Sequence, residues 1–169
     1  MPSGRRRALA LIGFMACGKS TVGSLVAARA GAPYRDLDAM IEARCGVTVA
    51  ELFARDGEAA FRDLETRLLP EALEPGTVAA LGGGTPLRDG NWALVRERAV
   101  SVWLDVPLSE LVARAGPGGD RPLLSGRAEV ELLALLEART PRYREADHRV
   151  DGSRPPEVVA EEVGRLWDG

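Results

Sequence analysis

The stretch Gly13-Phe14-Met15-Ala16-Cys17-Gly18-Lys19-Ser20 fits the pattern G-x-x-x-x-G-K-[ST] of a phosphate-binding loop at every defined position. The apolar run Ala8–Ile12 before it predicts a buried parallel strand. The run Thr21–Ala30 after it predicts a helix, because its apolar residues recur on one face. Strand, glycine-rich loop and helix in this order are the setting in which such a loop binds a nucleotide, so the stretch predicts a nucleotide site.

Lys19 is the one lysine of the chain, and the other Lys+Arg residues among the 22 are all arginine. A phosphate-binding loop needs a compact, rotatable ammonium group at the β- and γ-phosphates, where the planar fork of arginine fits poorly. The exception therefore favours a nucleotide site over the alternative, a glycine-rich turn with an incidental lysine.

Length and composition bound the function classes. At 169 residues and 46% hydrophobic, the chain predicts one domain, residues 1–169, with a sizeable core. A net charge of -3 argues against a nucleic-acid partner, and no apolar stretch approaches the roughly 18 residues of a membrane span. The two cysteines lack metal-ligand spacing and suit a reducing compartment, so we expect a cytoplasmic protein without membrane association.

Apolar runs alternate with helical patterns along the rest of the chain. We expect further strands at 33–35, 77–81, 100–104 and 149–150. We expect further helices at 39–45, from a capping box at 48–51, after Gly57 over 58–73, and at 91–98, 107–115, 128–138 and 156–167. This alternation predicts the α/β class, with a five-stranded parallel sheet flanked by helices in three layers. The stretch 116–122 has no periodicity and is either a surface loop or a hinged, mobile lid.

Polar residues follow the predicted strands, at the edge where a parallel sheet binds its ligands. Ser20 would bind Mg²⁺ directly, and a carboxylate from a neighbouring strand end could hold the ion through water. Asp36 and Asp38 offer that carboxylate. If the strand continues through them, they point to opposite sides, so one serves the metal and the other faces a second substrate. The Asp-x-Asp pair could equally cap the next helix.

Three further features carry candidate binding groups. The run Gly82-Gly83-Gly84 either lets a small ligand approach the backbone or forms a sharp turn. Arg121 lies in the glycine-rich stretch, from which it could reach a transferring phosphoryl group. Arg62 has Asp63 and Glu65 beside it, and taken alone it indicates a solvated helix charge.

With these motifs assembled, the chain resembles the shikimate kinases, which belong to the nucleoside-monophosphate-kinase-like group of P-loop proteins. The resemblance runs from about Ala8 to Trp167. Its motifs stand in the family's order and spacing; they are Gly13–Thr21, Asp36-Leu37-Asp38, Phe61-Arg62-Asp63-Leu64-Glu65, Leu81-Gly82-Gly83-Gly84, Arg121-Pro122-Leu123-Leu124 and Arg139-Thr140-Pro141-Arg142-Tyr143.

The resemblance implies ATP-dependent phosphorylation of the 3-hydroxyl of shikimate, in aromatic amino acid biosynthesis. It implies that Lys19 contacts the β- and γ-phosphates and that Ser20 ligates Mg²⁺, with Asp36 helping through water. Asp38 would bind the substrate hydroxyls where a base is needed. The implied catalytic residues are Lys19, Asp38 and Arg121.

The resemblance also implies the remaining binding residues. Arg62 and Arg139 would grip the shikimate carboxylate, whose shape matches a bidentate guanidinium, and Gly83 with its neighbours Gly82 and Gly84 would contact the substrate. The residues implied to bind ATP are Ala16, Cys17, Gly18, Lys19, Ser20, Thr21, Arg114, Arg121 and Arg154, with Arg114 and Arg154 flanking the adenine. A lid would span about 113–127, and a substrate-binding helical region about 37–65. The family is usually monomeric, and we expect a monomer.

One departure from the family concerns Ala16, because many members have glycine there. Alanine fits this position if the residue is right-handed, so the departure bears on the rigidity of the loop more than on activity.

Two alternatives to a shikimate kinase remain. A kinase of another small hydroxy acid, such as gluconate, would share the loop and the size, but it has no particular need for Asp38, Gly83 and the two arginines together. A non-catalytic nucleotide-binding relative would be expected to lose Lys19, Asp38 or Arg121, and all three are present.

Overall fold

The computed structural model of the chain describes residues 6–115 and 129–169. Within them, five strands form one sheet in the order β2-β3-β1-β4-β5, and every neighbouring pair is parallel. The strands are β1 (Ala8–Ile12), β2 (Tyr34–Asp36), β3 (Val78–Ala80), β4 (Ala99–Asp105) and β5 (His148–Asp151). The predicted α/β class and five-stranded parallel sheet are confirmed.

The centre of the sheet is β1, whose five residues have no exposed surface. It pairs with β3 on one side and β4 on the other, with Leu11 opposite Ala80 and Val102. A strand covered on both faces must be apolar throughout, which is the pattern that predicted it.

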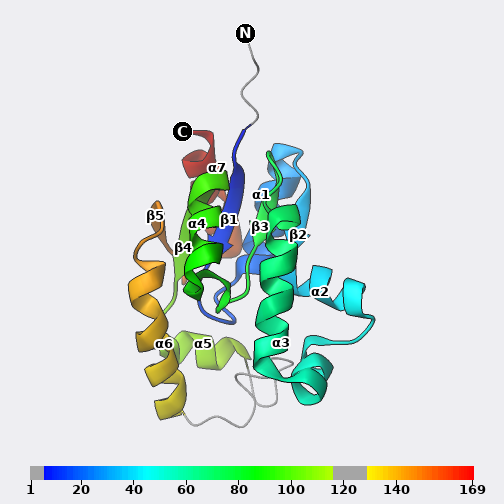
Figure 1. The fold of residues 1–169 in the computed structure, drawn as a ribbon. Helices are drawn as coiled ribbons and strands as arrows, with labels where there is room; N and C mark the ends of the chain where they lie inside the picture. The colour runs from blue at the N-terminus through cyan, green and yellow to red at the C-terminus, as the bar shows by residue number, and fades with distance from the viewer. Residues whose placement is uncertain (1–5, 116–128) are drawn as a thin grey trace.

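Helices cover both faces of the sheet. They are α1 (Lys19–Ala30), α2 (Leu37–Cys45), α3 (Val49–Ala72), α4 (Asp89–Arg98), α5 (Leu108–Ala115), α6 (Glu129–Tyr143) and α7 (Pro156–Asp168), with a short 3₁₀ helix η1 (Thr85–Leu87). The upper half of α3 and all of α4 lie in front of the sheet in Figure 1, and α1 and α7 lie side by side behind it. In the described part of the chain, no helix has the length and apolar character needed to cross a membrane.

Local sequence signals set the ends of α2 and α3. Gly46 closes α2 in a left-handed conformation, and α3 opens with the predicted capping box. In that box, the Glu51 amide donates to Thr48 Oγ1 at 3.2 Å, and the Thr48 amide donates to Glu51 Oε2 at 2.7 Å. Gly57, with φ 85° and ψ 172°, interrupts α3 as predicted, in backbone geometry that suits glycine.

The predicted end of α6 at residue 138 is wrong, because the helix continues through Tyr143 with Pro141 inside it. Tertiary contacts explain the extension. Arg139 and Tyr143 are both buried, and the Tyr143 hydroxyl donates to the Gly83 carbonyl at 2.6 Å. This anchoring compensates for the backbone donor that the proline removes. The predicted start at 128 lies outside the described residues.

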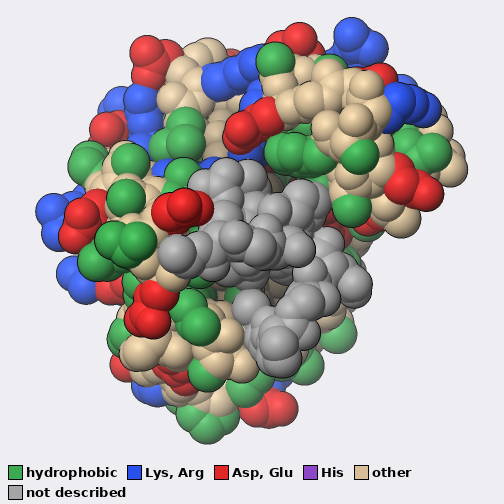
Figure 2. All heavy atoms as spheres, turned by 90° about the horizontal axis from the view of Figure 1, so that it is seen from below, with side chains coloured by type: hydrophobic (Ala, Val, Ile, Leu, Met, Phe, Trp, Pro, Cys, Tyr) green, Lys and Arg blue, Asp and Glu red, His purple; other side chains and the backbone are tan. Residues whose placement is uncertain are grey.

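The strands run downward in Figure 1, so their carboxyl ends meet at the lower end of the molecule. The loop after β1, helix α2, the first half of α3 and helices α5 and α6 lie at this end. Figure 2 looks onto it and shows charged side chains of both signs on the described residues around its centre. The fold therefore brings the predicted ligand-binding loops to one end.

Candidate active site

Backbone carbonyls of the loop between β1 and α1 hold the Lys19 ammonium against the loop. Lys19 is 7% exposed, and its Nζ donates to the carbonyls of Gly13 at 2.6 Å and Phe14 at 3.1 Å. Nζ also lies 3.8 Å from Cys17 Sγ. The positive end of α1 begins at the same place, so the loop concentrates positive potential where an anion such as a phosphate would bind.

Ala16 is left-handed, so the condition under which alanine fits the loop without strain is not met. Its φ is 63°, the one positive value at a non-glycine residue in the part of the chain that the structure describes. A left-handed conformation costs an L residue about 1–2 kcal/mol, because Cβ crowds the following carbonyl oxygen. The shape of the loop therefore prevails over the local preference of alanine.

Replacing Ala16 with glycine is expected to raise the free energy of unfolding by about 0.5–1 kcal/mol. Glycine relieves the strain, while the extra freedom of the unfolded chain offsets part of the gain. Urea unfolding measures the change. Ala28→Gly on the exposed face of right-handed α1 is the matched control and should lose about 1 kcal/mol. A similar decrease in the free energy of unfolding in both variants would contradict the presence of strain at Ala16.

Asp36 ends β2 and uses its two carboxylate oxygens differently. Oδ1 accepts the Ala39 amide at 3.1 Å and caps α2, whereas Oδ2 accepts the Ser20 hydroxyl at 2.7 Å. The Tyr34 hydroxyl also donates to Oδ2, at 3.4 Å. Burial, followed by the Asp36 charge, raises the pKa of Tyr34 to about 12. The prediction that Asp36 caps the next helix is confirmed, and the same carboxylate also accepts a hydrogen bond from Ser20.

Asp38 does not continue the strand, because α2 already begins at Leu37. The alternation of side chains along a strand therefore does not separate the two carboxylates. Asp38 instead lies in the first turn of α2 and lines the same cavity as Asp36 and Ser20.

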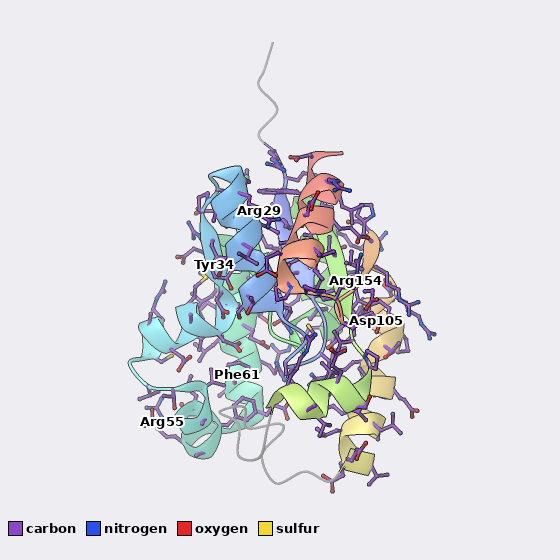
Figure 3. The ribbon with its side chains drawn as sticks, turned by 180° about the vertical axis from the view of Figure 1, so that it is seen from behind. Arg29, Tyr34, Arg55, Phe61, Asp105 and Arg154 are labelled. Carbon is purple, nitrogen blue, oxygen red and sulfur yellow. The ribbon has the colours of Figure 1, made fainter. Side chains whose placement is uncertain are left out.

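That cavity has a volume of about 620 Å³ and opens between the loop after β1, α2, α3, the end of β3 and α6. It brings together most of the predicted site residues from distant parts of the sequence. The predicted residues that line it are Lys19, Ser20, Asp36, Asp38, Arg62, Gly82, Gly83, Gly84 and Arg139. Phe61, at the lower end of α3 in Figure 3, and Phe53 add apolar wall, with ring centres 4.9 Å apart.

Arg62 is not the solvated helix charge that its sequence neighbours indicate, since its side chain is only 13% exposed. Its Nη1 donates to Glu65 Oε2 at 2.8 Å, and its Nη2 donates to Glu58 Oε1 at 3.2 Å. Burial opposes the charge of Arg62, but the Glu65 and Glu58 carboxylates outweigh it and raise the pKa of the guanidinium. Arg62 therefore stays charged at the cavity wall.

Arg139 is 3% exposed, and its guanidinium lies 5.5 Å from the centre of the Phe14 ring. Its Nε and Nη1 are buried without a hydrogen-bond partner among the described residues. A buried cation with unused donors is unfavourable until an anion accepts from them. The cavity therefore presents a preformed site for a carboxylate or another anion.

The glycine run lets both arginines approach the backbone. A Cβ on Gly84 would lie 2.6 Å from both terminal nitrogens of Arg62, and one on Gly83 would lie 2.9 Å from Arg139 Nη1. Any side chain there would displace a guanidinium.

Arg114 and Arg154 are not among the described residues that line the cavity. Arg114 donates to the Cys17 carbonyl at 3.3 Å and to the Gly152 carbonyl at 3.0 Å, so it ties the loop to the turn after β5. Arg154 pairs with Glu162, and its Nε donates to the carbonyl of Asp151 at the end of β5 at 3.2 Å. Arg121 and most of the predicted lid, 113–127, lie outside the described residues.

Sequence reasoning missed three groups that complete the site. Glu65 is a fully buried carboxylate, Thr85 donates to it, and the Tyr143 hydroxyl holds the Gly83 carbonyl. Burial raises the pKa of Tyr143 and keeps its hydroxyl protonated. The i,i+3 spacing of Arg62 and Glu65 was the one available signal for this set.

A family model described as shikimate kinase matches residues 15–166. The chain belongs to the shikimate kinase family. A shikimate kinase of Gloeobacter violaceus is 44% identical over 160 residues, which are 93% of this chain and 90% of that one. The resemblance read from the motifs is confirmed, and the chain is a kinase.

Solved structures agree with this membership. The shikimate kinase from Acinetobacter baumannii in complex with shikimate has a TM-score of 0.90 at 32% identity, covering 95% of this chain and 92% of that one. A gluconokinase from Sinorhizobium meliloti has a TM-score of 0.64 at 18% identity, covering 97% and 93%, and shares the fold alone.

Proposed function

We propose that the chain transfers the γ-phosphoryl group of ATP to the 3-hydroxyl of shikimate. One observation carries the proposal beyond family membership. The cavity that contains the loop lysine is also lined by Arg62 and by Arg139, whose Nε and Nη1 are buried without a partner among the described residues. A phosphoryl-transfer loop and a carboxylate site thus share one cavity, which suits a small hydroxy acid.

The residues would act mainly by positioning and by neutralising charge, as phosphoryl transfer requires. Arg62 and Arg139 would hold the carboxylate, and the backbone at Gly83 would contact the substrate. Asp38 would bind the hydroxyl and accept its proton. Lys19 would contact the β- and γ-phosphates.

We further propose that Ser20 and Asp36 hold Mg²⁺, Ser20 directly and Asp36 through water. Their oxygens fit the ion, because Mg²⁺ prefers hard oxygen ligands and the Ser20 hydroxyl already meets Asp36 Oδ2 at 2.7 Å. When bound, the ion would neutralise charge on the phosphates. The loop from Ala16 to Thr21 would contact ATP, with Arg114 and Arg154 flanking the adenine.

We propose residues 1–169 as a monomeric, single-domain cytoplasmic enzyme, with residues 37–65 forming its substrate-binding region. The many cavity-lining residues of α2 and α3 support that region, and the free thiols of Cys17 and Cys45 suit a reducing compartment. Light scattering on the eluting protein tests the monomer.

The deciding experiment is a coupled ADP-release assay with ATP and Mg²⁺, offering shikimate, quinate and gluconate in parallel. Turnover with shikimate is expected. Turnover with gluconate in its place would show a kinase of another hydroxy acid, and ATP binding without turnover on any acid would show a non-catalytic relative.

Gly84→Ala is expected to raise the KM for shikimate about tenfold and to leave the KM for ATP nearly unchanged. The backbone of Gly84, at φ -94°, accepts alanine, but the new Cβ would push the Arg62 guanidinium away. Losing one charged hydrogen bond has about this effect. Gly90→Ala is the matched control, because nothing lies within 4 Å of its Cβ. A tenfold rise in both variants would refute the role of Gly84.

A further inference from the structure

Glu65 is a carboxylate with no exposed surface, at the wall of the cavity. Its two oxygens have separate partners. Oε2 accepts from Arg62 Nη1 at 2.8 Å, and Oε1 accepts from the Thr85 hydroxyl at 2.6 Å. A buried carboxylate requires donors for both oxygens, so Thr85 supplies a contact that water cannot easily replace here.

Thr85 is itself fixed by the backbone around it. It has no exposed surface, and its amide donates to the Gly82 carbonyl at 3.0 Å. Its carbonyl accepts from Asn91 Nδ2 at 3.0 Å, and Asn91 is also buried. A Cβ on Gly82 would overlap Glu65 Oε1 and lie 3.1 Å from Thr85 Oγ1, so the glycine leaves room for this hydrogen bond.

The Arg62 guanidinium donates to two carboxylates that differ in burial. Glu65 is buried on the cavity side, whereas the Glu58 side chain is 54% exposed and accepts from Nη2 at 3.2 Å. If Glu65 turned away, the long Arg62 side chain could follow Glu58 toward solvent. The orientation of Glu65 therefore decides where the guanidinium points.

We propose that Thr85 is a positioning residue for substrate binding: its hydroxyl fixes the Glu65 carboxylate, which keeps Arg62 directed at the substrate carboxylate. Thr85 touches neither substrate nor nucleotide in this scheme, and it acts through two residues. The proposal rests on the proposed function, because it takes the carboxylate of shikimate as the group that Arg62 meets.

The test compares Thr85→Val, which removes the hydroxyl at constant shape, with Thr85→Ser, which retains it. Thr85→Val is expected to lower kcat/KM for shikimate about tenfold through KM, the size typical of a lost hydrogen bond to a charged group. Its kcat and its KM for ATP should stay within about twofold, and Thr85→Ser should restore shikimate affinity. Thr77→Val, at a buried threonine before β3, is the matched control and should leave both KM values unchanged.

Two measurements separate positioning from general damage. The methyl ester of shikimate lacks the anion, so Thr85→Val should lower its kcat/KM by less than about twofold. In an Arg62→Ala background, Thr85→Val should add no further loss. Equal losses for acid and ester, additive losses in the double variant, or a serine variant as weak as the valine variant would each overturn the proposal.

The ADP-release assay on the wild-type enzyme distinguishes failure of the proposed function from failure of the positioning role of Thr85. If the enzyme phosphorylates gluconate and not shikimate, the proposed function fails. The Arg62 Nε–H resonance in labelled protein, assigned with Arg62→Ala, then tests the positioning directly. It should match wild type in Thr85→Ser and shift or broaden in Thr85→Val, and an unchanged resonance would overturn the role of Thr85. If Thr85→Val does not fold, Thr85→Ala against Thr85→Ser carries the same comparison, since these differ by one oxygen.

Discussion

Lys19→Ala is expected to lower kcat by about 10³-fold or more, because transition-state charge on a transferring phosphoryl group is stabilised chiefly by fixed cations. Lys19 is well placed for this role. The residue is 7% exposed and its ammonium is already held by the Gly13 and Phe14 carbonyls, so little reorganisation is needed when phosphates arrive. Steady-state ADP release with saturating ATP and shikimate measures the loss.

The variant needs a control for loop damage, because removing Nζ also removes one hydrogen bond each from the Gly13 and Phe14 carbonyls. Each lost hydrogen bond costs about 1 kcal/mol, which thermal unfolding detects. Lys19→Met keeps the bulk of the side chain and should be as inactive as the alanine variant. Near-normal turnover in either variant would refute the role of Lys19.

Arg139→Ala is expected to raise the KM for shikimate about 100-fold and to leave ATP affinity nearly intact. Truncating one partner of a buried, hydrogen-bonded charge pair costs about 2–5 kcal/mol. Arg139 meets the conditions for such a pair, being 3% exposed with Nε and Nη1 lacking partners among the described residues. Initial rates across a grid of both substrates separate the two KM values.

Arg142→Ala is the matched control for Arg139, since it removes an arginine from the next turn of α6. Arg142 forms ion pairs with the exposed Asp89 and Glu145, and such pairs contribute about 0–1 kcal/mol. Both KM values should therefore stay near those of the wild type. An equal loss of shikimate and ATP affinity in Arg139→Ala would count against the carboxylate assignment.

The features predicted from sequence are those encoded locally. The loop around Lys19, the apolar β1, the Thr48–Glu51 capping box and the break at Gly57 each depend on a few adjacent residues. The end of α6 was missed for the opposite reason. Pro141 is a local helix breaker, and only the burial of Tyr143 against Gly83, 60 positions away, shows why the helix continues.

The site likewise contains residues whose place could be predicted from sequence patterns and residues whose place could not. The order of the strands brings Ser20 and Asp36 together, and the polar residues at the strand ends predict that edge of the sheet as the ligand-binding one. The roles of Arg62 and Arg139 came from the family resemblance alone, because helical arginines usually indicate solvated charge. The Thr85–Glu65 contact joins residues 20 apart, and no pattern of period 2 or 3.6 marks it.

The burial of Lys19 also bears on how this protein can be handled in the laboratory. Amine-reactive dyes and coupling resins meet one ε-amino group in the whole chain; it belongs to Lys19, which is 7% exposed, and it donates to two carbonyls. Labelling at neutral pH should therefore fall on the terminal α-amino group, whose ordinary pKa is also lower than that of lysine.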